Sequence, residues 1–154
     1  MVLDLFGCSK IGSIPKFTGI MKSLLELNLG ETAIKKLSPS SIKCLTALTL
    51  LDLTNCRNFK CFPSNMDSLR SLEKLILSGC SKLKSIPRLP STIRYINAQY
   101  CHSLEWSPAL VKLSSLSRPL SQWLAYDESG SGMAFTILYR HLQVIPSLSL
   151  SLSL

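Results

Sequence analysis

The chain has 154 residues, of which 30 are leucine and 25 are serine, and 46% of its residues are hydrophobic against 17% charged. This length suits one domain, and this apolar content is enough for a core, which argues against wholesale disorder. Lys and Arg number 17 against 9 Asp and Glu, a net charge of +8 that directs attention to acidic partners. No apolar run approaches the roughly 20 residues of a membrane span, and the first residues lack the basic start of a secretory signal, so we expect a soluble intracellular protein.

Aliphatic residues recur at a fixed step along residues 1–105. Three columns repeat with a 24-residue period: Leu24, Leu48 and Leu72; Leu27, Leu51 and Leu75; and Leu29, Leu53 and Leu77. A fourth column holds Cys8, Thr32, Cys56 and Cys80, and a fifth unit with Ile96 and Cys101 follows after a shorter, 21-residue step. Self-similarity of this kind is the signature of a repeat architecture.

Each unit predicts one short strand followed by a return arm. The pattern Leu-x-x-Leu-x-Leu-x-x-Cys alternates at its centre, as a strand with one buried face does. Pro15, Pro39, Pro63 and Pro87 follow in the first four units, and proline interrupts a helix, so we expect return arms that are extended or short 3₁₀ rather than long helices. One unit cannot bury its apolar residues alone, and stacking of about five such units predicts an α/β solenoid with parallel strands.

The repeat resembles the leucine-rich repeats of plant intracellular immune receptors, in the nucleotide-binding class whose N-terminal domain is similar to the Toll/interleukin-1 receptor (TIR-NBS-LRR). The likeness rests on residues 27–37 (LNLGETAIKKL), 51–59 (LDLTNCRNF) and 75–83 (LILSGCSKL), and on residues 90–105, which are similar to that family's closing repeat. It implies a leucine-rich-repeat solenoid over residues 1–105 with its strands on the concave side. The family's nucleotide-binding and Toll-like domains would lie upstream of Met1, so their chemistry is not carried by this chain.

The remaining residues lose the period. Residues 106–131 predict a Ser/Pro-rich linker, residues 132–145 an amphipathic helix of a truncated post-repeat domain, and residues 146–154 a low-complexity Ser-Leu tail. Met1 stands inside a repeat strand, so we expect either that another segment covers this apolar end of the stack or that the chain is a truncated product.

The cysteines raise the question of a metal site or of disulfides. Cys8, Cys56, Cys80 and Cys101 share one repeat position, which Thr32 occupies in the second unit. A metal ligand would not tolerate threonine, whereas a small buried residue would, so we expect structural packing with no metal, no cofactor and no disulfide. Because the chain also lacks the phosphate-binding and nucleophile motifs GxxxxGK[ST], GxGxxG and GxSxG, no enzyme is predicted.

Positive charge is concentrated just after the cysteine position. Stacking should align seven cations along one edge, which we call the basic edge: Lys10, Lys35, Lys36, Arg57, Lys60, Lys82 and Lys84. A nucleic acid is one candidate partner, but no aromatic residue interleaves with these cations, and a solvated rim or one that docks an acidic patch of another domain is favoured. In the family that the chain resembles, docking to the nucleotide-binding domain would hold the receptor inactive.

Residues that alternate with the buried leucines should point outward and form the main recognition surface. The candidate protein-binding residues are Asp4, Phe6, Glu26, Asn28, Leu50, Asp52, Thr54, Lys74, Ile76, Ser78, Tyr95, Asn97 and Gln99. Phe6, Leu50, Ile76 and Tyr95 are the candidate apolar anchors, since apolar groups ringed by polar ones make hot spots. The alternative is that they are ordinary scattered surface residues.

Together these features predict a non-catalytic protein-recognition module of a plant immune receptor. It would sense a pathogen effector or a guarded host protein in the cytoplasm, or alternatively in the nucleus, and would contribute to autoinhibition through the receptor's nucleotide-binding domain. No membrane partner is expected. The alternative is a truncated receptor product with only a structural or decoy role.

Overall fold

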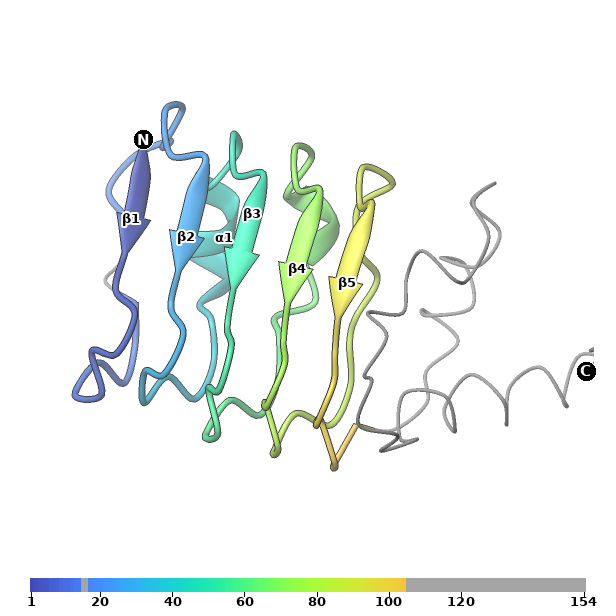
Figure 1. Ribbon diagram of the computed structural model, residues 1–154. Coiled ribbons are helices and arrows are strands. Elements are labelled where there is room, and N and C mark those ends of the chain that lie inside the picture. Colours follow the sequence, from blue (N-terminus) through green and yellow to red (C-terminus); the bar gives the residue numbers. More distant parts are fainter. Residues whose placement is uncertain (15–16, 105–154) are drawn as a thin grey trace, which may run out of the picture.

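Five short strands form one parallel sheet in the order of the sequence. The computed structural model describes residues 1–14 and 17–104. Its strands are β1 (Val2–Asp4), β2 (Glu26–Asn28), β3 (Leu50–Asp52), β4 (Lys74–Ile76) and β5 (Tyr95–Asn97). Figure 1 shows them side by side, with the return arms behind the sheet. The predicted solenoid of stacked parallel strands is therefore confirmed.

The strand register reproduces the spacing of the repeat. Leu27 lies beside Leu51, and Leu51 lies beside Leu75, which is the 24-residue step of the sequence. Leu75 lies beside Ile96 after the shorter, 21-residue step. Because the sheet stays in register, the three missing residues are taken from the return arm that follows Cys80.

A tight turn follows the strands. The N–H of Cys56 donates to the carbonyl oxygen of Leu53 at 3.0 Å, and the N–H of Cys80 donates to that of Leu77 at 3.0 Å. The residue just before the cysteine position has a positive φ, between 56° and 78°, in all five units: Gly7, Glu31, Asn55, Gly79 and Tyr100. A left-handed third residue under such a hydrogen bond is the geometry of a type II turn, which favours glycine or asparagine there.

Within residues 1–14 and 17–104 the return arms contain no long helix, in agreement with the prolines. α1 (Pro39–Cys44) begins at Pro39, where the missing N–H costs nothing, and η1 (Met66–Ser68) is a single 3₁₀ turn. Figure 1 shows α1 behind β2 and β3. α1 differs from the expected extended or 3₁₀ arm, since the N–H of Ile42 donates to the carbonyl oxygen of Ser38, four residues earlier, at 3.1 Å. The described residues of the first and fourth return arms contain no helix.

The aliphatic columns form one continuous core. Six strand leucines have an exposed fraction of 0%: Leu27, Leu29, Leu51, Leu53, Leu75 and Leu77. Burial of each such side chain stabilises the fold by roughly 1.5–3 kcal/mol. Leu3 and Leu5 of the first coil are only half-buried, because that coil packs against a neighbour on one side.

Three predicted segments lie outside the described residues: the linker at 106–131, the amphipathic helix at 132–145 and the Ser-Leu tail at 146–154. Among the helices of residues 1–14 and 17–104, none combines the length and the apolar character needed to cross a membrane.

Candidate functional site

The thirteen candidate protein-binding residues all lie on the outer face of the sheet, which we call the strand face. They flank the buried leucines of the five strands; Asp4, Phe6, Glu26 and Lys74 are exposed, and the other nine are half-buried. The register places Glu26 beside Leu50 and Asn28 beside Asp52. The structure thus brings these residues together on one surface, and their role in binding stays a prediction.

Four of these residues also hold the backbone where their strands end. An Oδ1 atom accepts a hydrogen bond from the N–H two residues later, at 2.7–3.1 Å, in Asp4, Asn28, Asp52 and Asn97. The same oxygen of Asp52 accepts the hydroxyl of Thr54 at 2.6 Å. These are Asx turns, which explain a polar residue in this column without any partner. The sequence signal for these Asx turns was the recurrence of Asp4, Asn28 and Asp52 at a 24-residue step, each just before a turn.

The ring of Phe6 lies against Gly30 of the next coil. A Cβ at Gly30 would stand 2.7 Å from Cδ2 of Phe6, so the ring occupies the space of the missing side chain. Gly30 is therefore buried, although alternation along the strand points it outward. Phe6 itself remains 52% exposed and presents its ring to a partner.

A further outward column was missed by the sequence reasoning. It precedes the strands and contains Met1, Leu25, Thr49, Glu73 and Arg94, joined from coil to coil by backbone hydrogen bonds such as Leu25 N–H to Met1 O at 2.9 Å and Thr49 N–H to Leu25 O at 2.7 Å. Leu25 follows the buried Leu24 and looks like a core residue. Its polar counterparts at the 24-residue step, Thr49 and Glu73, were the signal that it points outward.

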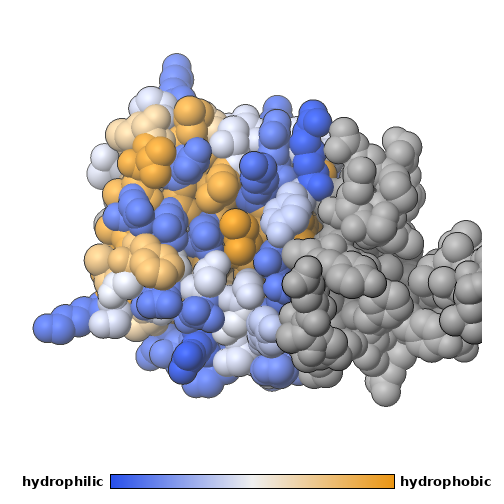
Figure 2. Space-filling view, in the orientation of Figure 1, coloured by the Kyte–Doolittle hydropathy of each residue, from blue (hydrophilic) through white to orange (hydrophobic). Residues whose placement is uncertain are grey.

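Exposed apolar side chains gather at one end of the strand face. We call them the apolar patch: Met1, Val2, Phe6 and Leu25. Figure 2 shows the apolar colour concentrated over β1 and β2 and polar colour along the lower edge. The other predicted anchors, Leu50, Ile76 and Tyr95, are half-buried. Asp4 and Glu26, both exposed, border the apolar patch.

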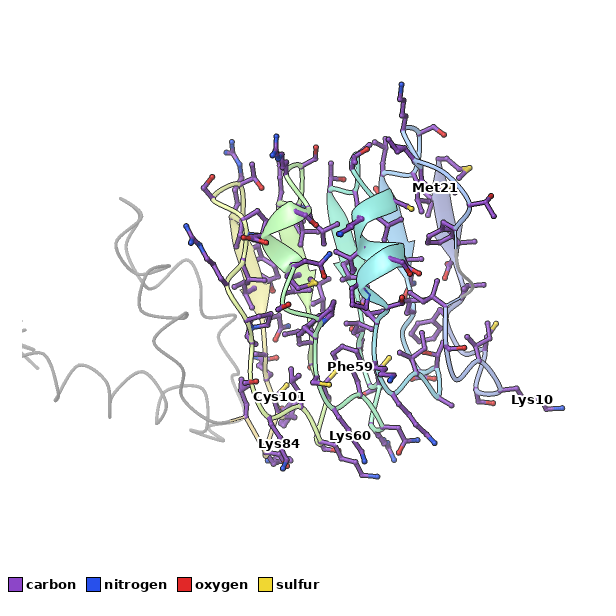
Figure 3. The ribbon with its side chains drawn as sticks, turned by 180° about the vertical axis from the view of Figure 1, so that it is seen from behind. Lys10, Met21, Phe59, Lys60, Lys84 and Cys101 are labelled. Atoms are coloured by element: carbon purple, nitrogen blue, oxygen red, sulfur yellow. The ribbon has the colours of Figure 1, made fainter. Side chains whose placement is uncertain are left out.

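The seven cations of the basic edge are all exposed. Figure 3 shows Lys10, Lys60 and Lys84 along the same edge of the solenoid. The N–H of Lys60 donates to the carbonyl oxygen of Lys35 at 3.0 Å, and that of Lys84 donates to Lys60 at 3.3 Å. Lysines of consecutive coils are therefore direct neighbours, as the stacking argument predicts.

A shallow hollow of about 320 Å³ lies beside the basic edge. Its lining is mainly polar and includes Ser9, Glu31, Asn55, Arg57 and Asn58. Asn55 Nδ2 donates to Oε1 of Glu31 at 3.4 Å across neighbouring coils. Such a lining suits a small polar or charged group more than an apolar one.

The thiols of Cys56, Cys80 and Cys101 form a ladder through the core. Their Sγ atoms donate to carbonyl oxygens of the preceding coil, those of Leu29, Leu53 and Leu77, at 3.0, 3.1 and 3.1 Å. Burial raises the pKa of all three thiols, that of Cys101 to about 11, so they stay protonated donors at neutral pH. The structure gives these cysteines a packing role.

Cys8 departs from the buried position expected of its column. It is exposed, whereas Thr32 in the next coil is buried, because the first coil has a neighbour on one side only. The Thr32 hydroxyl donates to Leu29 of its own coil at 2.7 Å rather than to the coil before. Among the described residues, no group of three or more His, Cys, Asp or Glu side chains is placed to hold a metal ion.

Comparison with known proteins agrees with this geometry. Residues 1–57 match the family described as leucine rich repeat. No curated protein and no solved structure matches the chain. Proteins built on such repeats are typically non-catalytic scaffolds that bind other proteins. With its single parallel sheet, tight turns and little helix, the described part of the chain has the fold of a leucine-rich-repeat solenoid.

Proposed function

We propose that the solenoid recognises a partner protein through the strand face, with the apolar patch as its anchor. The apolar patch is the observation that carries the proposal, because exposed apolar groups bordered by polar ones are the usual composition of a binding hot spot. The Asx turns and the backbone hydrogen bonds between coils fix the ends of the strands, so little conformational freedom is lost on binding.

The proposed setting is an intracellular plant immune receptor of the TIR-NBS-LRR class, in the cytoplasm or alternatively in the nucleus. The partner would be a pathogen effector or a guarded host protein. Support comes from the resemblance of residues 27–37, 51–59, 75–83 and 90–105 to that class. In the same receptor, docking of the basic edge to the nucleotide-binding domain would contribute to autoinhibition, and the solenoid itself would be non-catalytic and free of cofactors.

The test is the effector response of the full receptor in leaf cells. The double variant Phe6→Ala and Leu25→Ser removes apolar contact area at two half-exposed positions, and we expect it to abolish the cell-death response. The control is Ile20→Ser, which removes an even more exposed aliphatic side chain, 61% exposed, from the loop before β2. A normal response from the double variant, at wild-type protein levels, would show that the strand face is not the recognition surface.

The charge of Asp52 is tested separately, because its carboxylate also holds the backbone. Asp52→Asn keeps an oxygen that can accept from the Thr54 N–H, at 2.7 Å in the native chain, and removes only the charge. A loss of response from Asp52→Asn with unchanged thermal stability therefore reports on the partner, whereas Asp52→Ala would confound the two roles.

The second candidate is that the chain is a truncated receptor product with a structural or decoy role. Under this alternative, strand-face variants change no response, and the transcript upstream of codon 1 carries no in-frame nucleotide-binding domain. Sequencing that transcript separates the two candidates.

A further inference from the structure

The basic edge has a regular geometry of its own. Lys36, Lys60 and Lys84 occur at the 24-residue step, and a parallel bridge joins Lys36 to Cys61. Parallel neighbours in such a ladder are ~4.8 Å apart. The bridge pairs Lys36 with Cys61, the residue after Lys60, so the three lysines form a row along the edge of the second, third and fourth coils that is offset by one residue between the second and the third.

This row is not neutralised within the described part of the chain. The one ion pair among residues 1–14 and 17–104 joins Arg94 to Glu73, at 3.9 Å, in the column that precedes the strands. Lys82 donates to Oδ1 of Asn58 at 3.1 Å, a neutral partner. Like charges on neighbouring strands repel one another, so the row stores an unfavourable electrostatic energy that an anionic ligand would relieve.

The chemistry of the basic edge favours carboxylates over nucleotides. Six of its seven cations are lysines, which act as mobile point charges, and one is Arg57, whose planar fork could bind a carboxylate through two bonds. No aromatic side chain belongs to the basic edge, and stacking on aromatic rings supplies much of the affinity for single-stranded nucleic acids. A row of flexible cations along consecutive coils fits an extended acidic chain.

The hollow beside the row offers a place to fix the register of such a chain. Arg57, Asn58 and Ser9 are among the residues that line it, and its volume of about 320 Å³ is ample for one acidic side chain. Glu31 also lines the hollow and opposes an incoming carboxylate. The hollow thus has a charged residue that attracts an acidic side chain and another that weakens its binding.

We propose that the basic edge binds an extended acidic peptide segment of a partner protein, laid along Lys36, Lys60 and Lys84 with one acidic side chain in the hollow at Arg57. This inference deepens the docking role given to the basic edge under the proposed function, and it is independent of the strand face. In an extended peptide, side chains on one side recur every ~6.6–6.8 Å. The four-carbon stems of the lysines absorb the mismatch with the ~4.8 Å step of the coils.

The experiment measures binding of the 154-residue chain to a fluorescein-labelled peptide of six Glu-Ser repeats by fluorescence anisotropy in about 0.1 M salt. The edge variant combines Lys36→Gln, Lys60→Gln and Lys84→Gln. We expect the edge variant to bind at least about tenfold more weakly, since each exposed ion pair contributes about twofold to threefold. Glu31→Gln should bind about twofold more tightly, for the same reason.

The matched control combines Lys22→Gln, Lys43→Gln and Arg70→Gln, at three exposed basic residues that lie outside both the basic edge and the strand face. It removes the same charge, and we expect its affinity to stay within about twofold of the native chain, because exposed charges beyond a Debye length of about 10 Å are largely screened at 0.1 M salt. Circular dichroism melts establish that both triple variants are folded. All six substituted side chains are exposed, so neither triple variant removes a core contact.

Three results would overturn the proposal. They are an equal loss of affinity in the two triple variants, no binding of the acidic peptide to the native chain, or tighter binding of a 12-residue oligouridylate that the edge variant abolishes. The last result would identify a nucleic-acid surface instead. Because the apolar patch is intact in the edge variant, failure here leaves the Phe6→Ala and Leu25→Ser test of the strand face undisturbed.

Discussion

Gly79 and Gly7 occupy the same left-handed position of their turns but have different surroundings. A Cβ at Gly79 would collide with Oδ1 of Asn55 and stand 3.3 Å from the Cα atom of that residue. A Cβ at Gly7 would meet nothing within 4 Å. The two glycines have φ values of 78° and 74°, so the backbone strain of a substitution is the same at both.

This pair separates conformational strain from steric conflict. We expect Gly7→Ala to lower the free energy of unfolding by about 1 kcal/mol, because alanine is strained at positive φ. Gly79→Ala should cost at least about 1 kcal/mol more, since Asn55 must move. Urea unfolding at pH 7 measures both, and equal losses would contradict the close approach of Asn55.

At the residue scale the sequence predicts which side of the sheet a side chain takes but not what it touches. Alternation places Asp52 outward, and the structure agrees; it does not predict that Oδ1 of Asp52 accepts from Thr54. Alternation also points Gly30 outward, yet Phe6 of the preceding coil covers it. Contacts across coils depend on the size of a neighbour one full period away, which a single unit does not contain.

The thiol ladder is an element that links the coils. The thiols of Cys56, Cys80 and Cys101 reach backward to the preceding turn, and the carbonyl oxygen of Leu53 also accepts the N–H of Cys56 within its own turn. That oxygen thus has two donors, one from its own coil and one from the next. Loss of a proton from a thiol removes a donor and leaves a buried charge.

The ladder predicts a loss of stability at alkaline pH. Burial raises the pKa of these thiols above the value of the unfolded chain, so the native state holds its protons where the unfolded state releases them. Stability is then fully present below about pH 9 and falls as the pH rises through about 11, where Cys101 titrates in the native state. The free energy of unfolding measured between pH 7 and 11 should show this decline.

The double variant Cys80→Thr and Cys101→Thr tests the cause. Threonine occupies this position at Thr32, donates a hydrogen bond there and does not titrate in this range. The variant should lose less stability between pH 9 and 11 than the native chain, while Cys61→Ser, at an exposed thiol, should follow the native curve. An unchanged decline in the double variant would show that the thiol ladder is not its cause.

At the element scale the repeat predicts the strands well and the return arms less well. The 24-residue step places Leu51 and Leu75 in register because coils of equal length bring the same strand position back beside itself. The shorter step to Ile96 keeps the register because the return arm takes up the difference. Whether an arm becomes α1 or η1 depends on the few residues after each proline, and both outcomes satisfy the same spacing. The exposure of Cys8 depends on its place at the end of the stack rather than on its column.

Seven of the 17 basic residues lie on the basic edge, and this arrangement should make stability depend on salt. Lys60 lies between Lys36 and Lys84, so Lys60→Gln relieves repulsion on both sides. We expect a higher urea midpoint for Lys60→Gln than for the native chain at low salt. The difference should vanish near 1 M salt, where the Debye length is about 3 Å.

Lys22→Gln is the comparison, because Lys22 is exposed and does not belong to the basic edge. It should leave the urea midpoint unchanged at every salt concentration. A rise equal to that of Lys60→Gln would attribute the effect to net charge alone and not to the alignment of the coils.

At the scale of the whole molecule, the period alone predicts the architecture, while the apolar patch depends on the particular side chains of the first two coils. Val2 shares its column with Glu26 and Lys74, which are exposed in the same way. Only the side chains in the first two coils make that end of the strand face apolar. A consensus sequence of the repeat unit does not show this difference between the first two coils and the later ones.

The return arms become thinner from the second to the fourth. The second contains α1, the third a single 3₁₀ turn, and the fourth no helix and three residues fewer, while the sheet keeps a constant ~4.8 Å between strands. A thicker return arm separates neighbouring coils more on the side away from the sheet. The angle between the planes of successive coils should therefore be largest around α1 and become smaller toward β5. A rigid convex partner shaped to the tighter arc at β2 and β3 could not slide by one coil and fit again, so this unequal bending fixes its docking position.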